Sequence, residues 1–374
     1  MTAPPLSIAI HPARPGAARV SIRSTRPVKA ARVLENRSPE EALGMLPRLY
    51  SVCAMAQLDA GRRALAAAGS SINLFGEERG DRERVLLETA REHLWRILID
   101  WPALLESEAD PAQVMSLGKL NQWLRSSGEA PSADRAAGTP ALQLKELLRT
   151  GVFGREPSDW LSMDCEAVQD WSREVDTPAA NLVAFLIEQR WEDTGAIEPR
   201  FLPNVTNAEF NDRLAKDESD QFVTFPEWED EACETTPLLR QQNVPMVRQL
   251  LDRWGGGGLT RVVALLAELA GIPEQLTVVS SEAAQPHQTS LPENTGLSQV
   301  NAARGRLVHR AVVDQHRIRR YQVLAPTEWN CHPRGVLAKS LSALDSRNPS
   351  TVRKQAALLI TAIDPCVGYS LEVH

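Results

Sequence analysis

The strongest constraint on the fold is a long helical pattern in the first third of the chain. From Asp81 to Trp101, apolar side chains recur every three or four residues, and Pro102 follows directly. This spacing puts the apolar side chains on one face of an α-helix. Proline has no backbone N–H and disrupts a helix that would continue through it. The pattern therefore predicts a long helix that ends at Trp101.

Other segments carry signals for shorter helices. Ser38 can cap a helix that starts with proline, because serine accepts hydrogen bonds from free N–H groups. A second helix is predicted to begin near Pro47 and to carry Cys53 in its first turns. Asn348 or Ser350 can cap the last helix. The remaining predicted helices cover residues 141–149, 178–192, 237–254, 259–271 and 349–363.

Alternating apolar and polar residues predict two small β hairpins. The first covers residues 7–31, and the second pairs residues 307–313 with 317–324. Residues 128–140 are rich in Ser, Gly, Ala and Pro, which predicts a linker. Residues 274–303 are polar, with two prolines, and are expected to form a long surface loop.

Composition narrows the class of protein. The 374 residues are 43% hydrophobic and 24% charged, as in soluble globular proteins, and their length suits two domains or one large helical domain. The net charge of -7, without basic blocks, makes nucleic acid an unexpected partner. No apolar stretch approaches the roughly 20 residues that span a membrane, and no signal peptide is evident, so we expect a cytoplasmic protein. Five scattered cysteines suit reduced thiols.

Two segments at opposite ends of the chain contain a cysteine in a patterned setting. Residues 364–374 read Asp-Pro-Cys-Val-Gly-Tyr-Ser-Leu-Glu-Val-His, and residues 48–57 read Arg-Leu-Tyr-Ser-Val-Cys-Ala-Met-Ala-Gln. The first resembles the Asp-Pro-Cys-x-x-Cys-x-x-His signature of nickel-iron hydrogenase large subunits, with Tyr369 in place of one cysteine. The second resembles the family's Arg-x-Cys-Gly-x-Cys-x-x-x-His signature, with Tyr50 and Gln57 as replacements.

Two further segments extend the resemblance. Residues 303–309, Ala-Arg-Gly-Arg-Leu-Val-His, are similar to the family's Pro-Arg-Gly-x-Leu-x-His element. Residues 321–330, Tyr-Gln-Val-Leu-Ala-Pro-Thr-Glu-Trp-Asn, are similar to its Tyr-Gln-x-x-x-Pro-Thr-x-Trp-Asn element. The four elements stand in the family's order. The resemblance implies an α+β fold, predominantly α, in which a central bundle of long helices carries small peripheral antiparallel β hairpins and the two termini meet at a buried site.

The same resemblance implies a single degenerate large-subunit domain over residues 1–374. Its expected parts are a β hairpin with an entry helix, a helical segment with the first cysteine motif, a variable helical and loop insert, and a hairpin with the final helix and the second cysteine motif. These parts cover residues 1–46, 47–127, 128–300 and 301–374.

The resemblance also implies which residues bind metal. Cys53 matches a cysteine that bridges nickel and iron, and Cys366 matches a terminal nickel ligand. Two thiolates are too few for the family's four-thiolate nickel site. The glutamate that the family links to proton transfer falls on Ala31 in the ungapped alignment, and Glu35 matches it only in a competing register that needs a deletion. We therefore expect no nickel and no enzymatic hydrogen turnover.

This chain retains the residues that face the iron's cyanide ligands in the family better than it retains the nickel ligands. Arg304, Pro326 and Thr327 match the arginine and the Pro-Thr pair that donate hydrogen bonds to those cyanides. A guanidinium and neutral donors stabilise a negatively charged cyanide nitrogen. The resemblance thus implies a site for the Fe(CN)2(CO) unit alone. Cys331 and His332 have no ligand counterpart in the family, and His93 is expected to be a packed or surface residue.

This pattern resembles the HupK/HoxV type of hydrogenase accessory protein. The resemblance implies a scaffold that assembles or holds the Fe(CN)2(CO) unit before its transfer. The implied partners are a HypC-type chaperone, the iron-unit assembly proteins and the hydrogenase large-subunit precursor. One alternative is a metal-free mimic of the large subunit that recruits or protects maturation factors, in which the cysteines are ordinary buried thiols. The other is a reduced but active hydrogenase.

Overall fold

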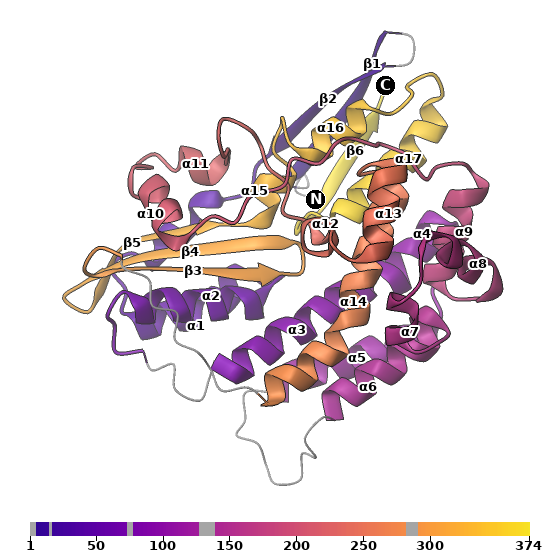
Figure 1. Ribbon diagram of the computed structural model, residues 1–374. Coiled ribbons are helices and arrows are strands. Elements are labelled where there is room, and N and C mark those ends of the chain that lie inside the picture. The colour runs from indigo at the N-terminus through magenta and orange to yellow at the C-terminus, as the bar shows by residue number, and fades with distance from the viewer. Residues whose placement is uncertain (1–4, 15–16, 73–77, 127–138, 282–290) are drawn as a thin grey trace.

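The computed structural model describes residues 5–14, 17–72, 78–126, 139–281 and 291–374 (Figure 1). The predicted linker at residues 128–140 lies outside these residues except for its last two, which begin α6. The helices of the first half are η1 (Val28–Leu34, 3-10), α1 (Pro39–Leu49), α2 (Ala54–Ala67), α3 (Glu78–Trp95), η2 (Arg96–Asp100, π), α4 (Trp101–Leu104), α5 (Pro111–Ser126), α6 (Thr139–Leu148), η3 (Arg149–Phe153, π), α7 (Pro157–Leu161), α8 (Cys165–Glu174) and α9 (Pro178–Glu188). Those of the second half are α10 (Asn207–Ala215), α11 (Gln221–Thr224), α12 (Pro237–Gln241), α13 (Pro245–Trp254), α14 (Gly258–Ser281), α15 (Pro326–Asn330), α16 (Val336–Ser342) and α17 (Pro349–Ile363).

The centre of the molecule is a helical layer organised around α14 (Figure 1). This helix packs against α3, α6, α12 and α13, and its apolar side chains belong to the largest hydrophobic cluster. Its Gly258–Val279 part is long and apolar enough to cross a membrane, but 72% of the apolar window is buried inside the protein. The burial identifies α14 as a core helix of the protein. Burial of its leucine and valine side chains supplies roughly 1.5–3 kcal/mol each.

Two three-stranded sheets lie beside this layer. β3 (Thr295–Ala302), β4 (Gly305–Asp314) and β5 (Arg317–Leu324) form an antiparallel sheet that packs on α2. β1 (Leu6–Arg14) pairs with β2 (Ala17–Ser24) and, in parallel, with β6 (Tyr369–Val373). The two ends of the chain are therefore joined in one sheet (Figure 1). The predicted α+β architecture with a dominant helical bundle is confirmed.

Several helix boundaries differ from the predictions. The second helix begins at Ala54, because Pro47 lies in the last turn of α1, where its missing N–H costs one hydrogen bond. The long helix does not end before Pro102, since a π turn carries it into α4, whose first turn tolerates the proline. The predicted helix 237–254 is split at Pro245 into α12 and α13.

The prediction of a surface loop over residues 274–303 is wrong at both ends, and its residues 282–290 lie outside the described part of the chain. Its first part continues α14 to Ser281, and its last part is β3, whose side chains are mostly buried. Pro273 and the polar residues around it hide the helical period in the sequence. The first hairpin is also shorter than predicted, because β2 ends at Ser24 and a 3-10 helix follows. By contrast, α17 has the predicted bounds, and Asn348 is its cap.

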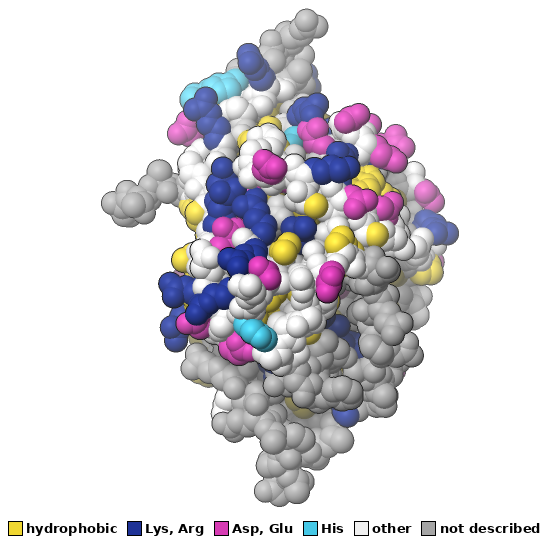
Figure 2. Space-filling view, turned by 90° about the vertical axis from the view of Figure 1, so that its left-hand side faces the viewer, with side chains coloured by type: hydrophobic (Ala, Val, Ile, Leu, Met, Phe, Trp, Pro, Cys, Tyr) yellow, Lys and Arg dark blue, Asp and Glu magenta, His cyan; other side chains and the backbone are white. Residues whose placement is uncertain are grey.

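One face of the molecule carries many charged side chains. Figure 2 views the side that lies on the left in Figure 1 and shows Lys and Arg gathered beside Asp and Glu. Arg32 of η1 and Arg320 of β5 both form ion pairs with Asp220. These two arginines therefore share one acidic partner.

Candidate functional site

The fold brings the five predicted site residues together. Cys53, Arg304, Pro326, Thr327 and Cys366 all line one cavity of about 210 Å³. They come from the start of α2, the β3–β4 turn, the start of α15 and the segment after α17. This volume is well above the roughly 10–15 Å³ that one water molecule needs. The cavity can hold a small ligand between the two thiols.

Cys53 occupies the N-cap position of α2 and makes no capping hydrogen bond with its side chain. The carboxylate of Glu88 instead accepts the backbone N–H groups of Met55 and Ala56 in the first turn, at 3.0 Å each. Burial raises the pKa of Glu88 to about 7, although these hydrogen bonds oppose the shift. Burial also raises the pKa of the Cys53 thiol, and the nearby Arg304 opposes that shift. In the metal-free protein Cys53 therefore stays a thiol at neutral pH.

Arg304 is the central cation of the site. Its Nη1 donates to the Cys53 sulfur at 3.4 Å, and its Nη2 donates to Glu92 Oε2 at 2.9 Å. Its side chain is only 2% exposed. Burial alone would lower the pKa of Arg304, but the charges of Asp364 and Glu92 hold it well above the usual value. The next residue must be Gly305, since φ is +137° and a Cβ would lie 2.3 Å from the Thr235 carbonyl oxygen.

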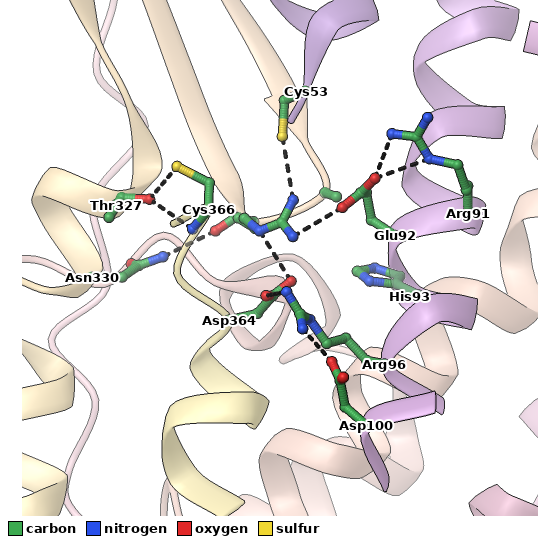
Figure 3. Close-up of polar contacts among 12 residues, drawn as sticks. Cys53, Arg91, Glu92, His93, Arg96, Asp100, Thr327, Asn330, Asp364 and Cys366 are labelled. Atoms are coloured by element: carbon green, nitrogen blue, oxygen red, sulfur yellow. Dashed lines mark hydrogen bonds and ion pairs between the residues drawn. The ribbon is translucent and has the colours of Figure 1, made fainter. Parts of the chain in front are cut away.

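Asp364 links this arginine to the helical core. It ends α17 in a left-handed conformation, with φ of 56°. One carboxylate oxygen lies 3.1 Å from Arg304 Nε, and the other lies 2.7 Å from Arg96 Nη2. Arg96 in turn pairs with Asp100. Figure 3 shows the resulting row of alternating charges, which runs from Glu92 to Asp100 past the two cysteines.

Cys366 is held by a hydroxyl group. Thr327 Oγ1 lies 2.9 Å from the Cys366 sulfur and accepts the Cys366 backbone N–H at 3.3 Å (Figure 3). Since the hydroxyl oxygen accepts that N–H, its hydrogen is free to point at the sulfur. Asn330, at the end of α15, donates to the Arg304 carbonyl oxygen at 2.9 Å. The short helix α15 thus fixes both Cys366 and the turn that carries Arg304.

The two tyrosines that replace cysteines lie in different places. Tyr50 lines the same cavity as Cys53, and burial raises its pKa to about 12. Tyr369 instead lines a neighbouring cavity of about 500 Å³, next to Arg96 and Trp95. The residues common to both cavities are Ser51, Val52, Arg304, Cys366 and Val367. Cys366 is therefore reachable from two sides.

A chain of neutral side chains lies behind the first cavity. His309 is fully buried and contacts the Tyr321 hydroxyl at 2.9 Å and Gln57 Oε1 at 2.8 Å. Burial lowers the pKa of His309 to about 3, so the ring is neutral. The amide oxygen of Gln57 can only accept, so the ring donates from Nε2 and accepts the hydroxyl hydrogen at Nδ1. Gln57, which stands where the family has a histidine, joins this chain to the cavity wall.

The residues expected not to bind metal do not line the cavity that holds Cys53 and Cys366. His93 is buried and contacts Glu268 Oε2 at 2.8 Å, and Glu268 also binds Arg240. Cys331 and His332 line neither cavity. Within the described residues, no group of three or more His, Cys, Asp or Glu is arranged to hold a metal ion. A metal here would depend on two protein ligands and on ligands that it brings itself.

Sequence reasoning missed several residues of the site. Arg26 and Glu328 line the first cavity as an ion pair, and Glu92 binds Arg304. Glu328 stands directly after the predicted Pro-Thr pair, which was a usable signal. Arg26 and Glu92 lie in segments without a motif, and only the fold brings them to the cavity.

The chemistry of the cavity is that of two soft thiols beside hydrogen-bond donors. Thiolates bind low-valent iron well, and each must lose its proton to do so. Arg304 and the Thr327 hydroxyl offer donors for a ligand with negatively charged or lone-pair ends. The donor set therefore fits an iron unit that carries cyanide.

Comparison with known structures defines the class of fold. The chain superposes on the nickel-iron-selenium hydrogenase of Desulfovibrio vulgaris Hildenborough with a TM-score of 0.58 at 15% identity, covering 95% of this chain and 94% of that one. The enzyme of Desulfomicrobium baculatum gives 0.55 at 16% identity, with 95% of each chain covered. Residues 260–368 match the nickel-dependent hydrogenase family model. The fold is that of a nickel-iron hydrogenase large subunit.

Relatives of similar length define the kind of protein more narrowly than the fold does. The chain is 28% identical to the hydrogenase expression/formation protein HoxV of Cupriavidus necator, covering 94% of this chain and 92% of that protein. It is 26% identical to HupK of Azotobacter vinelandii, with 95% and 94% covered, and 26% identical to HupK of Rhizobium leguminosarum bv. viciae, with 99% and 96% covered. The chain is a homologue of the HoxV and HupK proteins, as its motifs predicted.

Proposed function

We propose that this protein is a hydrogenase maturation accessory protein that holds the Fe(CN)2(CO) unit for transfer to a nickel-iron hydrogenase large subunit. One observation carries the proposal: Cys53 and Cys366, which are 313 positions apart in the sequence, line one cavity together with Arg304, Pro326 and Thr327. The names of the full-length relatives support a role in hydrogenase formation. A shape mimic would not need this polar interior.

In this proposal the two thiols ligate the iron, and Arg304, Pro326 and Thr327 hold its small ligands. Cys53 and Cys366 bind as thiolates after losing their protons. Arg304 would donate to one cyanide, and the Thr327 hydroxyl, with Pro326 beside it, would donate to the other. Tyr50 lies in the same cavity in place of a third thiolate, so the site takes no nickel and performs no hydrogen turnover. The protein acts in the cytoplasm as a carrier or assembly scaffold.

The same proposal names the partners. A HypC-type chaperone and the iron-unit assembly proteins would supply the unit, and the large-subunit precursor would receive it. Because Cys366 lines both cavities, an incoming ligand can approach it from the second cavity while the iron occupies the first. This arrangement suits transfer from one set of thiolates to another.

Infrared spectroscopy tests the proposal directly. The protein is purified without oxygen from cells that make the hydrogenase maturation proteins, beside the variants Cys53→Ala and Cys366→Ala. We expect cyanide and carbonyl bands and stoichiometric iron in the wild type, and neither in the two variants. Cys165→Ala is the matched control, because Cys165 lines neither cavity. A wild type without bands or iron would replace the proposal with the metal-free mimic.

A further inference from the structure

Arg26 is a second guanidinium at the cavity, from a part of the chain that holds no family motif. It lies between β2 and η1, and its side chain is 12% exposed. It lines the same cavity as Cys53 and Cys366. The β1–β2–β6 sheet places it there, because β2 leads into the Arg26 segment and β6 follows the Cys366 segment.

A buried carboxylate orients this arginine. Glu328 is 6% exposed at its side chain and forms an ion pair with Arg26 Nη1. Within the described residues, Arg26 Nε and Nη2 have no hydrogen-bond partner. Glu328 directly follows Thr327 in α15, so one short helix positions both the hydroxyl on Cys366 and the arginine. Arg26 therefore keeps donors available after its ion pair is made.

The two arginines differ in the donors that they leave free. Arg304 uses Nη1 for the Cys53 sulfur, at 3.4 Å, and Nη2 for Glu92. Arg26 lines the same cavity and, within the described residues, uses only Nη1, for Glu328. Two thiolates on iron would bring negative charge into the cavity, and the free donors of Arg26 can contact it.

We propose that Arg26 is a binding residue of this cavity and donates from Nε and Nη2 to an anionic ligand held at Cys366. This inference rests on the proposed function for the identity of the ligand, which is a cyanide nitrogen of the iron unit. Anion binding by Arg26 is a property of the cavity itself and does not require iron. The ligand class is therefore a small anion with a nitrogen or oxygen acceptor, bound beside a thiolate.

The decisive variant is the double substitution Arg26→Gln/Glu328→Gln. It removes both charges at once, so that no buried carboxylate is left unpaired and the fold is preserved. In the iron-loaded protein, we expect a several-fold loss of iron on gel filtration and a shift of at least one cyanide band. Arg32→Gln is the matched control, because Arg32 lies in η1 and lines neither cavity.

A second measurement uses the metal-free protein. Cys366 is alkylated with iodoacetate, which is anionic, or with iodoacetamide, which is neutral, and its modification is followed by peptide mass spectrometry. We expect the iodoacetate-to-iodoacetamide rate ratio to fall several-fold in the double variant and to stay unchanged in Arg32→Gln. Unchanged ratios in the double variant, together with unchanged cyanide bands wherever iron is bound, would overturn the inference. A fallen ratio in a protein that never binds iron would uphold anion binding by Arg26 and reject the proposed function instead.

Discussion

Cys53 and Cys366 line the same cavity, but different forces hold them. Cys53 occupies the N-cap position of a helix, two of whose free N–H groups are taken by Glu88, and it touches the guanidinium of Arg304. Cys366 lies in a short segment between α17 and β6 and is bonded to the Thr327 hydroxyl. The direct partner of the first sulfur is a charged guanidinium, whereas the direct partner of the second is a neutral hydroxyl.

The difference indicates separate tasks for the two thiols. Cys53 is fixed by a helix terminus and by buried ion pairs, so moving it would disturb several charges at once. Cys366 borders both cavities and depends on a strand of five residues for its position. In a carrier, the first suits a permanent anchor and the second suits the ligand that exchanges. Four predictions test this difference between the surroundings of Cys53 and those of Cys366.

The largest effect is expected at Arg304. Arg304→Met leaves Glu92 and Asp364 with one cationic partner fewer in a buried site, so we expect about 3 kcal/mol less free energy of unfolding. Urea denaturation measures the loss. Arg319→Met is the control, because its pair with Asp314 is about half exposed and contributes less than about 1 kcal/mol. Equal losses in both variants would mean that the charges around Cys53 do not stabilise the fold.

Glu88 should make the Cys53 side sensitive to pH. Burial raises the pKa of Glu88 from 4.5 to about 7, so the folded protein keeps a proton that the unfolded chain has already lost. Its contribution to stability therefore falls as pH rises from about 4.5 to about 7, by about 3 kcal/mol in total. Glu88→Gln cannot titrate. The stability difference between wild type and variant should change by this amount between pH 4.5 and pH 8 in denaturation experiments, and a constant difference would refute the assignment.

The residues that could be predicted are those that sit in contiguous motifs. Arg304, Thr327, Cys53 and Cys366 each lie within a short pattern, and the fold brings the patterns together as expected. The partners that hold them could not be predicted in the same way. Glu92 is 212 positions from Arg304, and no local spacing signals that pair.

The fold shows the same division between local and distant information. Asn348 and the apolar spacing after it predict α17 correctly, because a cap and a helical period are local properties. β3 was predicted as loop because its residues are polar in sequence, and they are buried only by contact with α2. β6 pairs with β1 from the other end of the chain, a contact that no local pattern encodes.

The direct partner of Cys366 is a neutral hydroxyl, so the effect of removing it should be smaller and should not come from a broken ion pair. Thr327→Val removes the hydroxyl that bonds the sulfur and leaves the Cys366 N–H without its acceptor, so we expect about 1–2 kcal/mol less stability. Thr327→Ser keeps the hydroxyl and should restore most of the loss. Thermal unfolding of the three proteins at two pH values measures both points. A loss that varied with pH would show that this side also depends on ionised groups.

The smallest effect is expected at His309, whose imidazole should not change its protonation between pH 8 and pH 5. His309 is connected through Gln57 to α2, the helix that Cys53 caps, yet it should contribute no charge to that side. Burial lowers its pKa to about 3, because a protonated ring between the Tyr321 hydroxyl and the Gln57 oxygen would be an uncompensated buried cation. We expect its ring nitrogen shifts to stay constant from pH 8 to pH 5 in nuclear magnetic resonance spectra, with the hydrogen on Nε2. A change in the His309 nitrogen shifts within this pH range would mean that a further buried charge lies behind the cavity, and the contrast between the two cysteines would then need a different explanation.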